Sequence, residues 1–267
     1  MSDAFEVASI PFVKASACGN DFLIIEGERA IEDIAAFTRR VCDRRRGVGA
    51  DGVEWIYSAS DADIEARLVN ADGSAAEISG NGTRCVAAYL ASQKKKEKFL
   101  IRTGAGLKTC VLTGRNSNLY EFETAMGPPV VEEELSLVLN RGVVRGIPVS
   151  MGNPHYVVFV DEILPDWMVE ASEIGHHHHF KDGVNVEVVA IEDANTIDVR
   201  FFERGVGETL SSGTGSCASA VAAIATQEAK SPVQVRALGG VQTVRWEQEI
   251  FVRGHAELVC RGELLVR

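Results

Sequence analysis

Short hydrophobic runs recur along this chain and predict most of its strands and helices. Runs of β-branched or alternating apolar residues are typical of strands. We expect strands at Phe22–Glu26, Val53–Tyr57, Ile64–Asn70, Tyr156–Asp161, Val184–Ala190 and Thr196–Phe202. Apolar residues at helical spacing predict an amphipathic helix from about Ile31 to Arg44 and a second around Trp167–Ile174.

Two other segments, Cys85–Ala91 and Cys217–Ala225, are apolar on nearly every side and follow glycine-rich turns. A helix without a polar face must be buried all round. We therefore predict an α+β fold of two pseudo-symmetric lobes, each a curved, mainly antiparallel sheet or barrel around a central buried helix.

Three features of the sequence repeat at one constant offset. Gly19-Asn20 returns as Gly152-Asn153, and the serine and glycines of Ser79–Gly82 return in Ser212–Gly215. Asn70 and Glu203, each nine residues before its serine, are separated by the same distance along the chain. Separate motifs rarely share an offset by chance, so the chain is predicted to be an internal duplication.

The duplication suggests two domains. We expect an N-terminal lobe at residues 1–123, completed by the C-terminal strand at about 256–267, and a C-terminal lobe at 124–255. Residues 125–150, with Gly127-Pro128-Pro129, are predicted to form the crossover between the lobes. The closing strands at about 242–246, 250–253 and 257–266 are compatible with either sheet.

The composition narrows the range of partners. A net charge of −11 and a pI near 5.1 argue against a nucleic-acid or membrane surface, and Lys94–Lys98 fits a solvated helix end. No apolar run approaches the roughly 20 residues of a membrane span, and residues 1–14 lack signal-peptide features. We expect a cytoplasmic protein.

No metal site is predicted. The six cysteines show no C-x-x-C spacing and are expected to be reduced thiols, neither a disulfide framework nor a zinc site. The run His176–His179 fits a solvated loop, because successive residues of an extended segment point to opposite faces.

The glycine-rich turns favour anion binding. The first N–H groups of a helix lack intrahelical partners and carry partial positive charge, so they suit a carboxylate or phosphate. If the duplication is a spatial pseudo-twofold, Ser79 and Ser212 flank one ligand in a cleft between the lobes. That arrangement suits racemisation, which needs acid/base groups on both faces of a carbon and donors that stabilise the carbanion.

Six segments, in this order along the chain, resemble the diaminopimelate epimerase family. They are FVKASACGNDF (Phe12–Phe22), GVGADG (Gly47–Gly52), Asn70–Cys85, MGNPH (Met151–His155), Asn185-Val186 and Glu203–Ala218. The resemblance covers nearly the whole chain. It implies an isomerase that uses no cofactor and interconverts LL- and meso-diaminopimelate on the route to lysine and peptidoglycan. It also implies a small-molecule amino-acid substrate and allows a homodimer.

The resemblance also implies a role for each motif residue. Ser79 and Ser212 stand at the two acid/base positions, and His155 and Glu203 lie beside the reacting carbon. The residues that hold the reacting carboxylate are Gly80, Asn81, Gly213 and Thr214. Those that hold the distal amino-acid end are Asn20, Asn70, Asn153, Asn185 and Arg204. Each residue taken singly also has a simpler interpretation. The asparagines are compatible with turn formers, Glu203 and Arg204 with a surface ion pair, and His155 with a hydrogen-bonded histidine within a strand.

The chain departs from the family at the most important positions, because the family carries cysteine where Ser79 and Ser212 stand. A thiol has a pKa near 8.5 and is readily ionised at a helix N-terminus. A hydroxyl is far less acidic, and the roughly 0.3–2 kcal/mol of a helix dipole does not close that gap. Cys85 and Cys217 lie roughly 7–9 Å further along their helices and are expected to line the core.

Three explanations of the serines stay open at this stage. They are introduced substitutions in an authentic epimerase, a diverged member that isomerises or dehydrates another amino acid, or an inactive amino-acid-binding paralogue. Ser16, where many relatives have histidine, favours natural divergence. A serine hydrolase built on Ser212 and His155 is disfavoured because no G-x-S-x-G motif is present.

Overall fold

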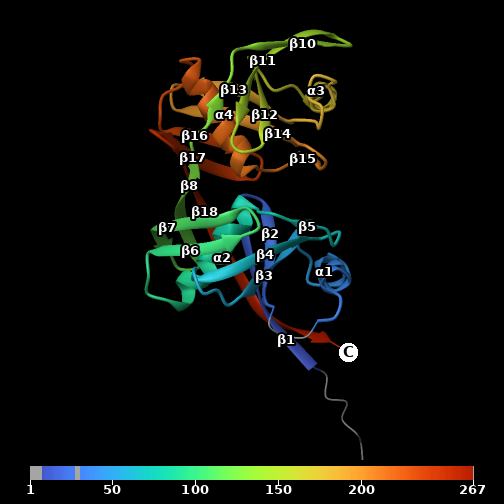
Figure 1. Ribbon diagram of the computed structural model, residues 1–267, viewed down its shortest axis with the longest axis vertical. Helices are drawn as coiled ribbons and strands as arrows, with labels where there is room; N and C mark the ends of the chain where they lie inside the picture. The colour runs from blue at the N-terminus through green and yellow to red at the C-terminus, as the bar shows by residue number, and fades with distance from the viewer. Residues whose placement is uncertain (1–7, 28–30, 267) are drawn as a thin grey trace, which may run out of the picture. The chain divides into compact units, whose positions relative to one another are not determined.

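The computed structural model describes residues 8–27 and 31–266. The chain forms two compact units (Figure 1). Unit 1 comprises the residues up to Phe122 together with those from His255 onward, and unit 2 comprises Glu123–Gly254. The sequence prediction that no signal peptide begins the chain concerns residues 1–14, of which 1–7 lie outside the described residues.

Unit 1 is a curved sheet around one helix. Its elements are β1 (Ala8–Ala17), β2 (Asn20–Glu26), α1 (Ile34–Cys42), β3 (Gly52–Tyr57), β4 (Ile64–Asn70), β5 (Ala75–Ala76), α2 (Gly80–Gln93), β6 (Lys98–Thr103), β7 (Gly106–Asn116), the start of β8 (Leu119–Gly127) and most of β18 (Ile250–Val266). The pairs β2–β3 and β4–β6 are parallel, whereas β1–β2, β3–β4, β4–β5 and β6–β7 are antiparallel.

Unit 2 repeats this plan. Its elements are β9 (Val130–Val131), β10 (Leu135–Leu139), β11 (Gly142–Ser150), β12 (Pro154–Val160), α3 (Trp167–Gly175), β13 (Asn185–Asp193), β14 (Thr196–Glu203), β15 (Gly207–Thr209), α4 (Gly213–Ala225), β16 (Val233–Ala237), β17 (Gly240–Trp246) and the start of β18 (Ile250–Val266). Here β12–β13 and β14–β16 are the parallel pairs.

The offset of the sequence repeat holds for whole elements. Helices α1 and α3 begin at positions 34 and 167, α2 and α4 at 80 and 213, and strands β3 and β13 at 52 and 185. Each pair is separated by the offset that relates Ser79 to Ser212. The predicted fold class, two similar α+β halves with mainly antiparallel curved sheets and central helices, is therefore confirmed.

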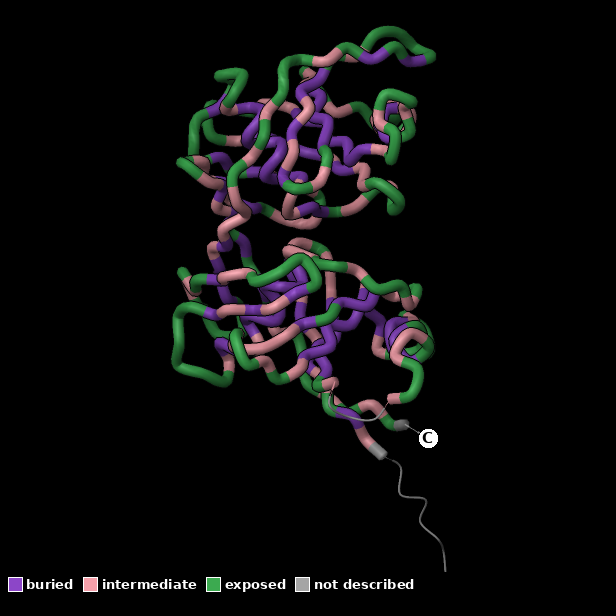
Figure 2. Tube along the Cα trace, in the orientation of Figure 1, coloured by how far each residue is buried: buried purple, intermediate pink, exposed green. Residues whose placement is uncertain are grey.

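The central helices fill the cores. In α2 every residue from Asn81 to Ala88 is buried, and in α4 every residue from Gly215 to Ala223 (Figure 2). Small side chains such as Ala87, Ala220 and Ala222 allow the surrounding strands to pack closely on them. In the described part of the chain, no helix combines the length and the apolar character that crossing a membrane requires.

Two sequence predictions about the strands and their connections were wrong. Residues 125–150 are not a plain crossover, because β9 and β10 both pair with β11 in unit 2. The last two predicted strands are one continuous strand, β18, which pairs with β17 in unit 2 and with β1 in unit 1. A single long strand satisfies backbone groups in both units without a turn.

Candidate functional site

Ser79 and Ser212 are the N-cap residues of α2 and α4. Each has extended backbone angles, and its Oγ accepts the N–H of the third helical residue: Gly82 at 3.0 Å and Gly215 at 3.2 Å. The glycine-rich segments were predicted to be turns that precede the helices, but they form the first helical turns themselves. The serine side chains supply the hydrogen bonds that permit this early start.

A buried glutamate packs against the same glycine in each unit. A Cβ added to Gly82 would lie 2.0 Å from Oε1 of Glu54, and one added to Gly215 would lie 2.7 Å from Oε1 of Glu187. A side chain at either position would displace the carboxyl group from the helix. Glu54 is 3% exposed and Glu187 is 1% exposed, and the two glutamates are themselves related by the repeat offset.

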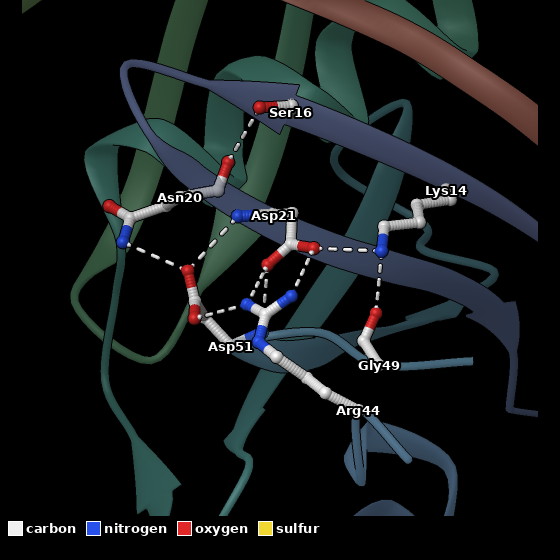
Figure 3. A network of polar contacts seen from close by, with 7 residues as sticks. All are labelled: Lys14, Ser16, Asn20, Asp21, Arg44, Gly49 and Asp51. Atoms are coloured by element: carbon white, nitrogen blue, oxygen red, sulfur yellow. Dashed lines mark hydrogen bonds and ion pairs between the residues drawn. The ribbon is translucent and has the colours of Figure 1, made fainter. Parts of the chain in front are cut away.

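In unit 1, hydrogen bonds hold Asn20 beside the first turn of α2. The Asn81 amide donates to Asn20 Oδ1 at 2.7 Å, and Asn20 Nδ2 donates to Asp51 Oδ2 at 3.2 Å. Asp51 also accepts the N–H of Asp21 and pairs with Arg44 (Figure 3). The structure thus brings Asn20, Gly80 and Asn81 together near Ser79.

The charges of this network are matched. Burial raises the pKa of Asp21, but hydrogen bonds from Arg44 and Lys14 outweigh it, so the pKa lies below its ordinary value. Arg44 reaches both carboxylates, at 2.6 Å from Asp21 and 2.9 Å from Asp51 (Figure 3). Asp51, from the GVGADG motif, therefore orients Asn20 through a partly buried ion cluster.

Replacing Asp51 by alanine is expected to lower the free energy of unfolding by about 1–3 kcal/mol, because the Asn20 amide, the Asp21 N–H and Arg44 all lose an acceptor. Urea unfolding measures the change. The matched control is Asp61→Ala. Asp61 and its partner Arg102 are both exposed, so loss of this ion pair should lower the free energy of unfolding by under about 1 kcal/mol. An Asp51 variant as stable as the Asp61 variant would contradict this role of Asp51.

Asn70 is hydrogen-bonded through its side chain to a turn beside this cluster. Its side chain donates to Ser74 Oγ at 3.0 Å, and its backbone N–H donates to the Ser74 carbonyl, so it closes the turn between β4 and β5. Register places Asn70 opposite Gly52, next to Asp51. The turn-forming interpretation of this asparagine therefore agrees with its contacts.

In unit 2, a polar chain leads from the interior to the first turn of α4. His155 is 1% exposed, and its Nδ1 lies 2.7 Å from Glu187 Oε1. Its Nε2 lies 3.1 Å from Asn153 Oδ1, and Asn153 Nδ2 donates to Thr214 Oγ1 at 3.4 Å. Because the imidazole ring of His155 has a hydrogen-bond partner at both nitrogens, these contacts fix its orientation.

Glu203 belongs to the same neighbourhood. It ends β14, and its Oε1 accepts the hydroxyl proton of Thr209 at 2.6 Å. Burial and the nearby Glu187 raise the pKa of Glu203, against the hydrogen bond from Thr209. Burial likewise raises the pKa of Glu187, although His155 opposes the shift. A carboxyl with a raised pKa next to a histidine is suited to proton transfer.

Asn185 and Arg204 lie beside each other at the adjoining strand ends. Asn185 Oδ1 accepts the backbone N–H of Arg204 at 3.0 Å, while its amide donates to the Pro154 carbonyl at 2.9 Å. The Arg204 guanidinium donates to the Asp182 carbonyl at 3.3 Å. It does not pair with Glu203 in the described contacts, so these two residues are not the surface ion pair considered as an alternative.

Sequence reasoning missed Glu54, Glu187 and Asp51. The repeat offset contained a signal for the first two, because it relates position 54 to position 187 just as it relates the glycines that they contact. The prediction for Cys85 and Cys217 is confirmed, since both are fully buried in the cores. Burial raises the pKa of Cys85 far above its ordinary value, so this thiol is poorly suited to ionise.

The fold and the paired helix N-termini define a class of proteins built from two equivalent halves, each with a central helix. A model of the diaminopimelate epimerase family matches residues 12–132 and 147–259. The chain belongs to this family, and the resemblance stated from its six motifs is confirmed.

Individual relatives support the assignment. A diaminopimelate epimerase of Caldanaerobacter subterraneus is 34% identical over 271 residues, covering 95% of this chain and 98% of that protein. One of Methanococcus maripaludis is 34% identical over 275 residues, with 95% and 99% covered.

Solved structures with much lower identity share the fold. A PhzF-family phenazine biosynthesis protein of Bacillus anthracis has a TM-score of 0.72 at 17% identity, covering 97% of this chain and 100% of that one. A probable proline racemase of Agrobacterium radiobacter has a TM-score of 0.72 at 18% identity, with 97% and 93% covered.

Proposed function

We propose that this protein is an isomerase that exchanges the α-proton of LL- and meso-diaminopimelate, slowly because serine stands at both acid/base positions. The observation that carries the proposal is the duplicated helix N-terminus, with Ser79 and Ser212 as N-caps and His155 and Glu203 grouped beside one of them. Relatives with the name diaminopimelate epimerase support the choice of substrate.

The proposed reaction requires both N-termini to contact one substrate molecule. The N–H groups at Gly80 and Gly213 would stabilise its carboxylate as charge develops during loss of the α-proton. Ser79 and Ser212 would transfer protons on opposite faces of the carbon, and Glu203 with His155 would bind the amino group. Asn20, Asn70, Asn153, Asn185 and Arg204 would hold the distal amino-acid end.

One structural observation supports a second candidate, an amino-acid-binding paralogue without turnover. Each serine Oγ already accepts a helical N–H, so the serines stabilise α2 and α4 whether or not any proton is transferred. A diverged member acting on another amino acid is the third possibility. The predicted homodimer, the cytoplasmic location and the lack of nucleic-acid binding remain predictions.

Meso-diaminopimelate is expected to raise the melting temperature, because it binds only the folded protein. At a concentration one hundred times its Kd, it should add about 2.7 kcal/mol to the free energy of unfolding. Differential scanning fluorimetry over a panel of amino acids, with lysine as the matched control lacking the second carboxylate, measures this. A shift with another amino acid and none with diaminopimelate would reject the substrate.

Proton exchange separates the candidates. The same panel is incubated in D₂O, and loss of the α-proton signal is followed by NMR. Exchange on diaminopimelate supports the isomerase, whereas binding without exchange supports the paralogue.

A further inference from the structure

Glu54 faces the central helix of unit 1. On β3 the side chains alternate between the two faces of the sheet. Val53 and Trp55 pack with Phe37 and Val41 of α1, whereas Ile56 packs in the core around α2. Glu54 therefore projects toward α2, where it is 3% exposed.

The carboxyl group of Glu54 lies at the first turn of α2, next to Ser79. The position of a Cβ on Gly82 would be 2.0 Å from Glu54 Oε1 and 3.2 Å from the Cβ of Ser79. The N–H of Gly82 also donates to Ser79 Oγ. The glycine thus touches both the carboxyl and the serine, and its missing side chain lets them approach.

Burial of Glu54 favours the protonated form of its carboxyl group. Titratable groups near this end of α2 are Arg84 and Cys85 on the helix, Cys18 in the turn between β1 and β2, and Asp21 on β2. Arg84 donates to Asn81 Oδ1 and lies 3.7 Å from Cys18 Sγ. Burial raises the pKa of Glu54 to about 8.

Unit 2 shows what Glu54 lacks. Its counterpart Glu187 is bonded to His155, but the residue that the repeat offset relates to His155 in unit 1 is Phe22. A phenyl ring neither donates nor accepts the proton of a carboxyl group. Unit 1 therefore contains a buried acid beside its N-cap serine, without the imidazole that pairs with the equivalent acid.

We infer that Glu54 is the proton-holding residue of unit 1 and acts on the substrate through the Ser79 hydroxyl. When the α-proton leaves, Ser79 Oγ takes it while the Glu54 carboxylate takes the hydroxyl proton, and the C–H electron pair stays on the substrate carbon. In the reverse direction the Glu54 carboxyl returns its proton to Oγ as the hydroxyl proton moves to carbon.

This inference rests on the proposed function and deepens it. A serine alone is a poor base, because its hydroxyl is ionised far less readily than a thiol. Coupling it to a base whose pKa lies near ambient pH is the usual way to activate a hydroxyl group. Glu54 supplies such a group inside unit 1.

The test is a double-mutant cycle on α-proton exchange of meso-diaminopimelate in D₂O. In the unaltered protein the rate should rise with pH to an inflection near 8, and Glu54→Gln should lower it by about 10²-fold and abolish the inflection. With Ser79→Cys, whose thiol is its own base, Glu54→Gln should change the rate little. Equal losses in both backgrounds would overturn the inference, as would an unchanged profile. Glu97→Gln, at an exposed position of unit 1, is the matched control.

A second measurement does not depend on activity. Infrared difference spectra between pH 6 and 9.5 should show a protonated carboxyl band that is absent from Glu54→Gln and shifts in frequency in Ser79→Ala. If no α-proton exchange occurs but the carboxyl band of Glu54 is present and shifts in Ser79→Ala, the proposed function is rejected, whereas the coupling of Glu54 to Ser79 is not. A band that Ser79→Ala leaves unmoved would reject the coupling of Glu54 to Ser79, even in an active enzyme. Circular dichroism confirms that each variant is folded.

Discussion

Replacing Ser79 and Ser212 together by cysteine is expected to raise the rate of epimerisation of diaminopimelate by about 10²–10⁴-fold for each acid/base group restored. Both positions are N-caps of long helices, where partial positive charge favours a thiolate. One thiolate and one thiol can then coexist near neutral pH. Stereochemical analysis of the product by chromatography measures net epimerisation, and NMR measures exchange.

The matched control for that experiment is Ser136→Cys, which adds a thiol at an exposed position of β10. It should leave the rate unchanged. The double variant should also be less stable, by about 0.5–2 kcal/mol for each cap, because sulfur is a weak acceptor for the N–H of Gly82 and Gly215. Equal epimerase activity before and after the double change would show that the serines are not the limiting groups.

The second large effect is expected in the pH dependence of stability. The pKa of Glu54 is about 8 in the folded protein, against an ordinary value of 4.5. As pH rises between these values, the unfolded chain loses the proton that the folded chain keeps, so the free energy of unfolding falls. The contribution of Glu54 to the free energy of unfolding is fully present below about pH 4.5. It falls by ~4–5 kcal/mol as the pH rises to about 8.

The side-chain amide of the Glu54→Gln variant does not ionise in this pH range, so its free energy of unfolding should not fall for this reason. Its stability relative to the unaltered protein is expected to increase steadily from pH 4.5 to pH 8, as measured by urea unfolding at several pH values. Taking the difference between the two proteins cancels carboxylates such as Asp21, whose lowered pKa acts below pH 4. Glu97→Gln, at an exposed site, should show no such trend. Parallel stability curves for the unaltered protein and Glu54→Gln would contradict the burial of an uncompensated acid.

Much of the fold was predictable because its signals are local. Ile64–Asn70 was predicted to be a strand and is one with those bounds. The apolar character of Cys217–Ala225 indicated burial on all sides, which the core of unit 2 confirms. The start of the same helix was missed, because glycines are unfavourable in helices, and the first turn is stabilised by the hydrogen bond that the Gly215 N–H donates to Ser212 Oγ.

The candidate site was only partly predictable. Its motif residues follow from the repeat and the family resemblance. Glu54 and Glu187, however, lie inside strands among apolar neighbours, and a strand pattern does not tell which face a glutamate shares with a helix. Asp51 stood within a recognised motif, but its bond to Asn20 joins residues that are 31 positions apart.

The sequence by itself determined the duplication, the two central helices and the family, because each is encoded in the order and spacing of residues. Tertiary structure alone decided which polar groups became buried neighbours. The pKa of Glu54 depends on its removal from water, and the orientation of His155 depends on Glu187, 32 residues away. For these polar groups, burial and contact across strands are properties of packing, and no local pattern specifies them.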